Sequence, residues 1–201
     1  MTVTQTTSTP LSSAAPVDSP KRRPFLVLYT LLGVLLLAAG TYAFAWYRAY
    51  RLTETFMQNA AESFAAEEYL NALTGYEVFD EADNRYVYRG GYGQVALIWS
   101  DPYAWPRPAA LSDAQARTEE IIGQRLTLED AEAFVEENIG QSNPYLGPIY
   151  LRVGELYEEE GDADDAADVY EDVVDSFPND AALVARATEH LERLEAAEAS
   201  E

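Results

Sequence analysis

The densest group of side chains that could bind an ion is an acidic run near the C-terminal end: Glu158, Glu159, Glu160, Asp162, Asp164, Asp165 and Asp168. Carboxylate oxygens are the ligands that Ca²⁺ prefers. An EF-hand loop, however, needs Gly at its sixth place and Glu at its twelfth, and a loop counted from Asp162 has Ala167 and Val173 there. The run therefore favours a solvated, acidic helix and turn over a calcium site.

Other motifs that could carry catalysis are missing from the sequence. The glycine-rich stretch 89–93 (RGGYG) has no predicted strand before it and lacks the Lys and Ser or Thr of a phosphate-binding loop. The single histidine, His190, has Glu189 and Glu192 nearby on the polar side of a predicted helix, which favours a surface position. The chain has no Cys, and neither GxSxG nor HExxH occurs. We therefore expect no enzymatic activity, cofactor, metal or small-molecule substrate.

The net charge argues against a second class of function, nucleic-acid binding. The 201 residues carry 35 acidic and 13 basic side chains, a formal charge of −22, and the region after Trp46 has 34 acids against 10 Arg, or −24. Such a surface repels phosphate backbones. One Lys against 12 Arg, with this excess of acid, also fits adaptation to high salt, an alternative that composition leaves open.

An apolar run near the N-terminus predicts a membrane anchor. Residues 25–46 contain no charge, polar amide or proline over 22 residues. At about 1.5 Å per residue this run is long enough to cross a hydrocarbon core of about 30 Å. Aromatic residues crowd its far end, as they do at a headgroup boundary. Residues 47–64 contain no Gly or Pro, so we expect the helix to continue out of the lipid.

The flanks of the apolar run bear on its orientation and on its processing. Residues 1–24, rich in Ser, Thr and Pro, predict a disordered tail, and the three basic residues 21–23 favour a cytoplasmic N-terminus with the C-terminal domain outside. Cleavage as an export signal is the alternative, because residues 43–45 (AFA) have the form of a signal-peptidase site and residues 22–26 (RRPFL) resemble a twin-arginine signal. The length of the apolar run favours an uncleaved anchor in the cell membrane.

Helix start and stop signals dominate the rest of the chain. Residues 112–115 and 127–130 have the form of capping boxes, and Gly140 and Gly161 stand where helices would end. Residues 85–99 contain β-prone side chains, but their apolar positions also share one helical face, and we expect a helix there. These signals predict an all-α fold.

A spacing of small and aromatic residues occurs twice in this region. Two small residues stand 12 apart with a Tyr four places later, at Gly154, Ala166 and Tyr170 and again at Ala60, Ala72 and Tyr76. Paired small residues let two antiparallel helices approach closely, and the aromatic side chain fills the groove beside them. The spacing therefore predicts helical hairpins.

These residues resemble the tetratricopeptide repeat (TPR), a helix–turn–helix unit of about 34 residues. The resemblance is strongest over residues 147–180 and weaker over residues 53–86, where Glu67-Glu68 replaces the usual Gly-Asp. The spacing between the two units requires an irregular stretch over residues 87–146. We expect an insertion at residues 100–111 and a divergent hairpin of two helices over residues 112–140.

The apolar run predicts one transmembrane helix, and the resemblance implies that a short TPR-like solenoid of helical hairpins follows it over residues 47–195. Residues 181–195 carry an apolar stripe on an otherwise charged helix, which is typical of a solvating cap helix. Residues 196–201 are expected to be a disordered tail.

In the family, the first helix of each hairpin lines a concave groove that receives a partner segment. Carried over by position, this groove implies partner contacts at Met57, Phe64, Leu151, Glu155, Glu158 and Glu159. Its acidic end favours a basic or amphipathic segment of another protein. Tyr103 and Trp105, in the stretch 100–108 (SDPYAWPRP), are either exposed interface anchors or side chains folded onto a neighbouring hairpin.

Two functions fit these expectations. The first is a membrane-anchored TPR-like scaffold or adaptor that mediates protein–protein interactions in the assembly or trafficking of envelope proteins. The second is a structural accessory subunit that is stably integrated in a larger membrane protein complex.

Overall fold

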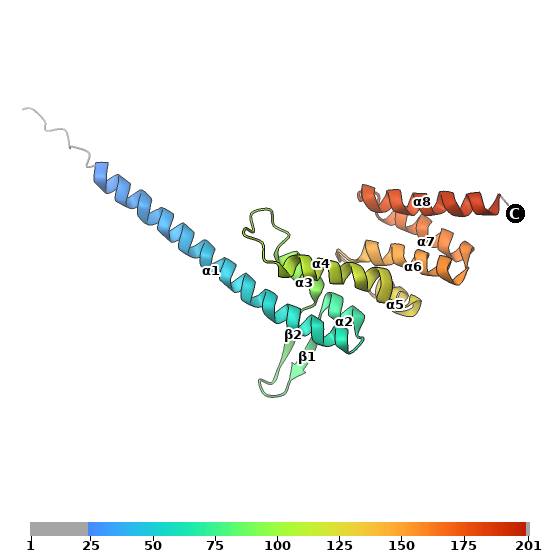
Figure 1. The fold of residues 1–201 in the computed structure, drawn as a ribbon, viewed down its shortest axis with the longest axis horizontal. Helices are drawn as coiled ribbons and strands as arrows, with labels where there is room; N and C mark the ends of the chain where they lie inside the picture. Colours follow the sequence, from blue (N-terminus) through green and yellow to red (C-terminus); the bar gives the residue numbers. More distant parts are fainter. Residues whose placement is uncertain (1–23, 200–201) are drawn as a thin grey trace, which may run out of the picture. The chain divides into compact units, whose positions relative to one another are not determined.

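The computed structural model describes residues 24–199 of the chain (Figure 1). Of these residues, 73% lie in helices and 6% in strands, so the expectation of a mostly helical protein is confirmed. The predicted tail over residues 1–24 lies outside the described residues except for Pro24. The elements follow in the order α1 (Pro24–Ala65), α2 (Tyr69–Thr74), β1 (Tyr76–Asp80), β2 (Arg85–Arg89), α3 (Tyr92–Ile98), α4 (Ala110–Glu120), η1 (Ile121–Arg125), α5 (Leu128–Asn138), α6 (Leu146–Glu160), α7 (Ala163–Ser176) and α8 (Ala181–Glu198).

Helix α1 contains the apolar run and continues beyond it for almost twenty residues without a break. Among the described residues it is the one helix that is long and apolar enough to cross a membrane, with a mean hydropathy of 2.0 over an 18-residue window. The chain separates into two compact units, Met1–Phe44 and Ala45–Glu201. The second unit contains the C-terminal part of α1 and all the elements that follow.

A β-hairpin corrects the prediction of a helix over residues 85–99. Strand β2 pairs antiparallel with β1, with Val87 opposite Val78 and Tyr86 opposite Phe79. The alternation of these side chains therefore has the period of a strand, and only the second half of the stretch, α3, is helical. Gly91 stands between the two halves. A Cβ atom there would lie 2.5 Å from the backbone oxygen atoms of α2, so the close approach of the chain to α2 requires a glycine.

Because of this β-hairpin, residues 53–86 do not form the pair of long helices that a tetratricopeptide unit requires. After α1 ends at Ala65, α2 has only six residues, and Gly75 with φ of 72° ends it. The chain then turns into β1 instead of completing a second long helix. The paired small residues Ala60 and Ala72 are nevertheless buried, at 1% and 0% exposure.

Helix α4 begins earlier than its predicted capping box. It starts at Ala110, and the Ser112 hydroxyl donates to the Ala109 carbonyl inside the first turn, so Ser112 does not cap it. The helix continues into the π-helical turn η1. Thr127 caps α5 as predicted, since its hydroxyl oxygen accepts a hydrogen bond from the Asp130 backbone N–H.

Helices α6 and α7 form the hairpin that the spacing predicted between residues 147 and 180. Gly161, with φ of 85°, ends α6 in the left-handed conformation, and Asp162 caps α7. A Cβ atom on Gly154 would lie 2.5 Å from the Tyr170 ring, so the small residue is what allows the two helices to pack closely.

Helix α8 packs against α7, as expected for a cap helix (Figure 1). It extends to Glu198, so the prediction of a disordered tail from residue 196 is wrong for its first three residues. Residues 200–201 lie outside the described residues. Leu183 and Ala187 of α8 close a small core with Leu151 and Tyr170 of the hairpin.

A larger core joins the elements from α1 to α6. Trp99, at 2% exposure, donates its indole N–H to the buried Thr53 hydroxyl oxygen over 2.8 Å and so fixes α3 to α1. The Tyr145 hydroxyl donates to the Gly93 carbonyl over 2.9 Å and connects the start of α6 to α3. These contacts hold the irregular middle of the chain and the α6–α7 hairpin in one unit.

Candidate partner-binding site

One face of α6 carries two tyrosines that are seven residues apart. Tyr150 and Tyr157 lie two helical turns from each other, and Val153 lies between them. Helix α5 packs on one side of α6 and α7 on the other. The two phenol groups therefore stand on a strip between two neighbouring helices.

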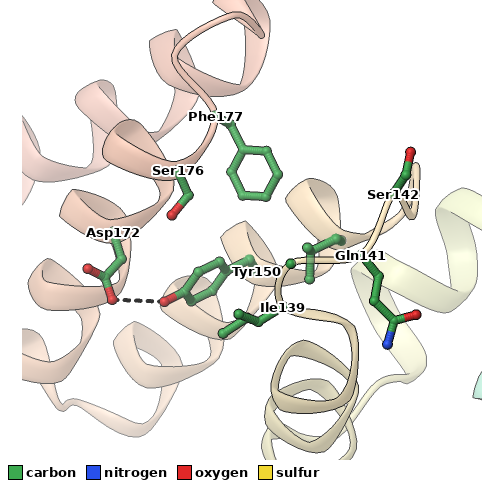
Figure 2. A pocket seen from close by; sticks show the side chains of 9 residues that line it. Ile139, Gln141, Ser142, Tyr150, Asp172, Ser176 and Phe177 are labelled. Carbon is green, nitrogen blue, oxygen red and sulfur yellow. Dashed lines mark hydrogen bonds between the residues drawn. The ribbon is translucent and has the colours of Figure 1, made fainter.

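Two hollows open along this strip and share Ile139 and Tyr150. The larger has a volume of about 600 Å³ and lies between the α5–α6 loop, the start of α6 and the end of α7 (Figure 2). The smaller has a volume of about 400 Å³ and lies between α5, the rest of the strip and Val169 of α7. We call the two together the α5–α7 groove.

The floor of the groove is apolar and its walls are acidic. Ile139 is 62% exposed and lies at the position common to both hollows. The lining residues, all in the described part of the chain, include the acids Glu132, Glu136 and Asp172 and no Lys or Arg. A segment with apolar anchors and basic side chains matches this lining.

Hydrogen bonds hold both tyrosines in place. The Tyr150 hydroxyl donates to Asp172 over 2.8 Å, as Figure 2 shows, and the Tyr157 hydroxyl donates to Glu132. Burial and then the hydrogen bond to Asp172 raise the pKa of Tyr150 to about 12. The hydrogen bond to Glu132 and then burial raise the pKa of Tyr157 to about 12. Both phenols stay protonated near neutral pH, while each carboxylate keeps lone pairs that could accept from a bound cation.

The acids that the sequence assigned to a groove are occupied by neighbours within the fold. Glu155 forms ion pairs with Arg152 and Arg186, at 3.2 and 2.9 Å. Glu159 pairs with Arg152 at 2.7 Å. These pairs connect side chains of α6 with each other and with α8.

Glu158 contacts side chains of both α7 and α8. The Tyr170 hydroxyl donates to it over 2.6 Å, and His190 and Arg193 of α8 lie at 2.5 and 3.2 Å. His190, expected at the surface, is instead half-buried, with its ring centroid 4.7 Å from that of Tyr170. A sequence shows the acids but not which cations the fold brings to them.

The apolar residues assigned to the predicted groove are covered to different extents. Leu151 is 1% exposed in the core beneath α8 and has no free surface for a partner. Met57 is half-buried against the larger core. Phe64 contacts the Tyr69 ring, and the Arg117 guanidinium lies 5.0 Å from its ring centroid.

Tyr103 and Trp105 lie in the loop between α3 and α4, where they are 84% and 75% exposed. The structure therefore brings the eight predicted residues to three separate places, on α1, on this loop and on α6. It does not assemble them into one groove.

The α5–α7 groove was not predicted because the tetratricopeptide pattern assigns the partner contacts to another face of α6. A signal for it existed in the sequence. Leu146, Tyr150, Val153 and Tyr157 recur at intervals of three and four residues, which marks an apolar helical face. What no local pattern indicates is that two neighbouring helices leave part of this face open.

The described part of the chain offers no arrangement for metal chemistry. Within residues 24–199, no three His, Asp or Glu side chains come together in a way that could hold a metal ion.

No family model, curated protein or solved structure matches the chain. Over residues 24–199 the protein is mostly helical, with one membrane-length helix and a second unit that carries the α5–α7 groove.

Proposed function

We propose that the protein is a membrane-anchored, TPR-like adaptor that binds a basic or amphipathic segment of another envelope protein in the α5–α7 groove. The observation that carries this proposal is the lining of the groove, in which three acids and no basic residue accompany apolar side chains. A surface with this lining attracts cationic side chains and buries apolar ones.

Two further features support the proposal. Helix α1 has the length and the hydropathy of a membrane anchor, and its apolar part lies next to the N-terminus. The α6–α7 hairpin has the close packing at Gly154 and the glycine turn at Gly161 that are similar to a tetratricopeptide unit. An adaptor of this kind holds its partner near the membrane without catalysing a reaction.

The test uses single substitutions in the full-length protein. Ile139→Glu places a charge on the apolar floor, and Glu136→Lys reverses a wall charge. Both residues are exposed, so the fold should remain intact. Glu137→Lys is the matched control, because Glu137 is also exposed on α5 and does not line the groove.

The readout is purification of each protein from gently solubilised membranes of its own source, with partners quantified by mass spectrometry. We expect a substoichiometric set of partners that is lost at higher salt and in the Ile139→Glu and Glu136→Lys proteins but kept in the Glu137→Lys protein. If the partners instead co-purify in a constant, near-equal ratio to the protein and their amounts do not change with these substitutions, the adaptor is contradicted and a structural accessory subunit is favoured.

A further inference from the structure

The loop of residues 100–109, the α3–α4 loop, presents aromatic side chains to the outside of the molecule. Among the described residues, no other large apolar side chain is as exposed as Tyr103 and Trp105. Large aromatic rings with this exposure indicate a contact site when a contact within the protein fixes the position of their loop.

A hydrogen bond fixes the position of this loop along α1. The Trp46 indole N–H donates to the Pro106 carbonyl oxygen over 2.8 Å. The Trp46 ring also packs edge-on against that of the buried Trp99, with centroids 5.9 Å apart. Trp46 is the last residue of the uncharged run, where the sequence places the end of the hydrocarbon core. An anchor whose hydrocarbon core ends at Trp46 would therefore hold the loop at the level of the membrane boundary.

The headgroup layer on each side of the hydrocarbon core is only a few ångströms thick. A bilayer has a core of about 30 Å and a total thickness of about 40 to 45 Å, which leaves about 5 to 8 Å for each headgroup layer. Consecutive Cα atoms are separated by at most about 3.8 Å, and Trp105 directly precedes Pro106. The backbone of Trp105 thus lies next to the residue that Trp46 binds.

The charge of the loop also fits a lipid surface. The loop contains one acid, Asp101, at its start, and residues 102–111 (PYAWPRPAAL) contain none, although the region after Trp46 carries −24. Their single charge is Arg107, which is exposed and complements lipid phosphate groups. The carboxylate of Asp101 accepts a hydrogen bond from the Tyr103 backbone N–H over 2.8 Å at the start of the loop. Because carboxylates are costly to desolvate, contact with lipid is confined to the residues that follow it.

We propose that the α3–α4 loop is a second membrane contact, in which Tyr103 and Trp105 insert into the phospholipid headgroup layer beside the end of the transmembrane helix. The inference rests on the membrane anchor of the proposed function and goes beyond it. A second attachment would restrict rotation of the protein about the axis of the transmembrane helix and so fix which face of the second unit is turned toward the membrane.

The absence of Cys from the chain makes single-cysteine reporters possible in the full-length protein. A fluorescent label at Pro102→Cys or Ala109→Cys reports on the two ends of the loop, and both residues are exposed. Ala38→Cys reports on the transmembrane helix, and Glu171→Cys, exposed on α7, reports on solvent. Each protein is reconstituted into bilayers with equal parts of phosphatidylcholine and phosphatidylglycerol and quenched by lipid with a nitroxide near its headgroup or by aqueous iodide.

We expect lipid quenching at residues 102 and 109 to exceed that at residue 171 by several-fold. It should fall close to the value at residue 171 when Tyr103 and Trp105 are both replaced by Ser. Lipid quenching that stays at the level of residue 171, or that survives the double replacement, overturns the inference. Protection from both lipid and iodide also overturns it, because the loop is then covered by protein.

The label at residue 38 separates the two proposals. If it is quenched by lipid while the loop labels are not, the anchor stands and the second contact fails. If it is quenched only by iodide, the anchor and the inference that depends on it fail together.

Discussion

Glu158 connects the cap helix to the α6–α7 hairpin through a single carboxylate. Tyr170 of α7 and His190 and Arg193 of α8 all approach it. Partial burial raises the pKa of Glu158, but the hydrogen bonds from Tyr170 and His190 and the charge of Arg193 outweigh this effect and hold the pKa below its ordinary value of 4.5. The carboxylate therefore stabilises the fold in its ionised form.

The pH dependence of this contribution has a defined sign. Because the pKa of Glu158 is lower in the folded than in the unfolded chain, its contribution is complete above pH 4.5 and is lost as the pH falls through the folded pKa. We expect Glu158→Gln to lower the free energy of unfolding at neutral pH by about 1 to 3 kcal/mol. The difference from the parent protein should shrink below the folded pKa, as urea titrations at several pH values would measure. A pH-independent difference would contradict this role.

At the scale of elements, the close packing of α6 and α7 depends on the side chain that Gly154 lacks. The Tyr170 ring is fully buried and hydrogen-bonded, so it has little room to move away from a new Cβ atom. Gly123, in η1, has no neighbouring atom within 4 Å of the place that a Cβ atom would take, and it provides a matched comparison.

We expect Gly154→Ala to lower the free energy of unfolding by about 1 to 2 kcal/mol, since the steric cost exceeds the gain in helix propensity. Gly123→Ala should leave it unchanged or raise it slightly. Urea unfolding followed by circular dichroism measures both changes. Equal effects of the two substitutions would show that the contact with Tyr170 does not limit the packing of these helices.

At the scale of the whole molecule, the proposed function requires that α1 keeps the second unit at a membrane. A charged side chain at the centre of a transmembrane helix costs about 2.5 to 3.5 kcal/mol. We expect the double substitution Leu35→Arg and Leu36→Arg to release the protein from membranes, whereas Leu35→Ala and Leu36→Ala should not. Fractionation after an alkaline carbonate wash measures the distribution.

The same fractionation distinguishes an anchor from a cleaved export signal. We expect the membrane-bound protein to retain residues 25–46, as N-terminal sequencing or intact mass would show. A mature protein that begins at Trp46 would contradict the anchor. It would keep the hydrogen bond from Trp46 to Pro106 but would lose the membrane boundary that places the α3–α4 loop.

The amino-acid sequence by itself determined the features that depend on local periodicity. The long α1, the α6–α7 hairpin around Gly154 and the turn at Gly161 all follow from the spacing of neighbouring residues, because helix formation and helix capping are local. The β-hairpin was missed because its side chains fit both a helical and a strand period, and only its pairing with β1 decides between them. The tertiary structure alone decided which side chains pair with Glu155 and Glu158. It also decided that the α5–α7 groove is open. Ion pairs across helices, and the part of a helix face that its neighbours leave open, depend on contacts between residues that are distant in the chain.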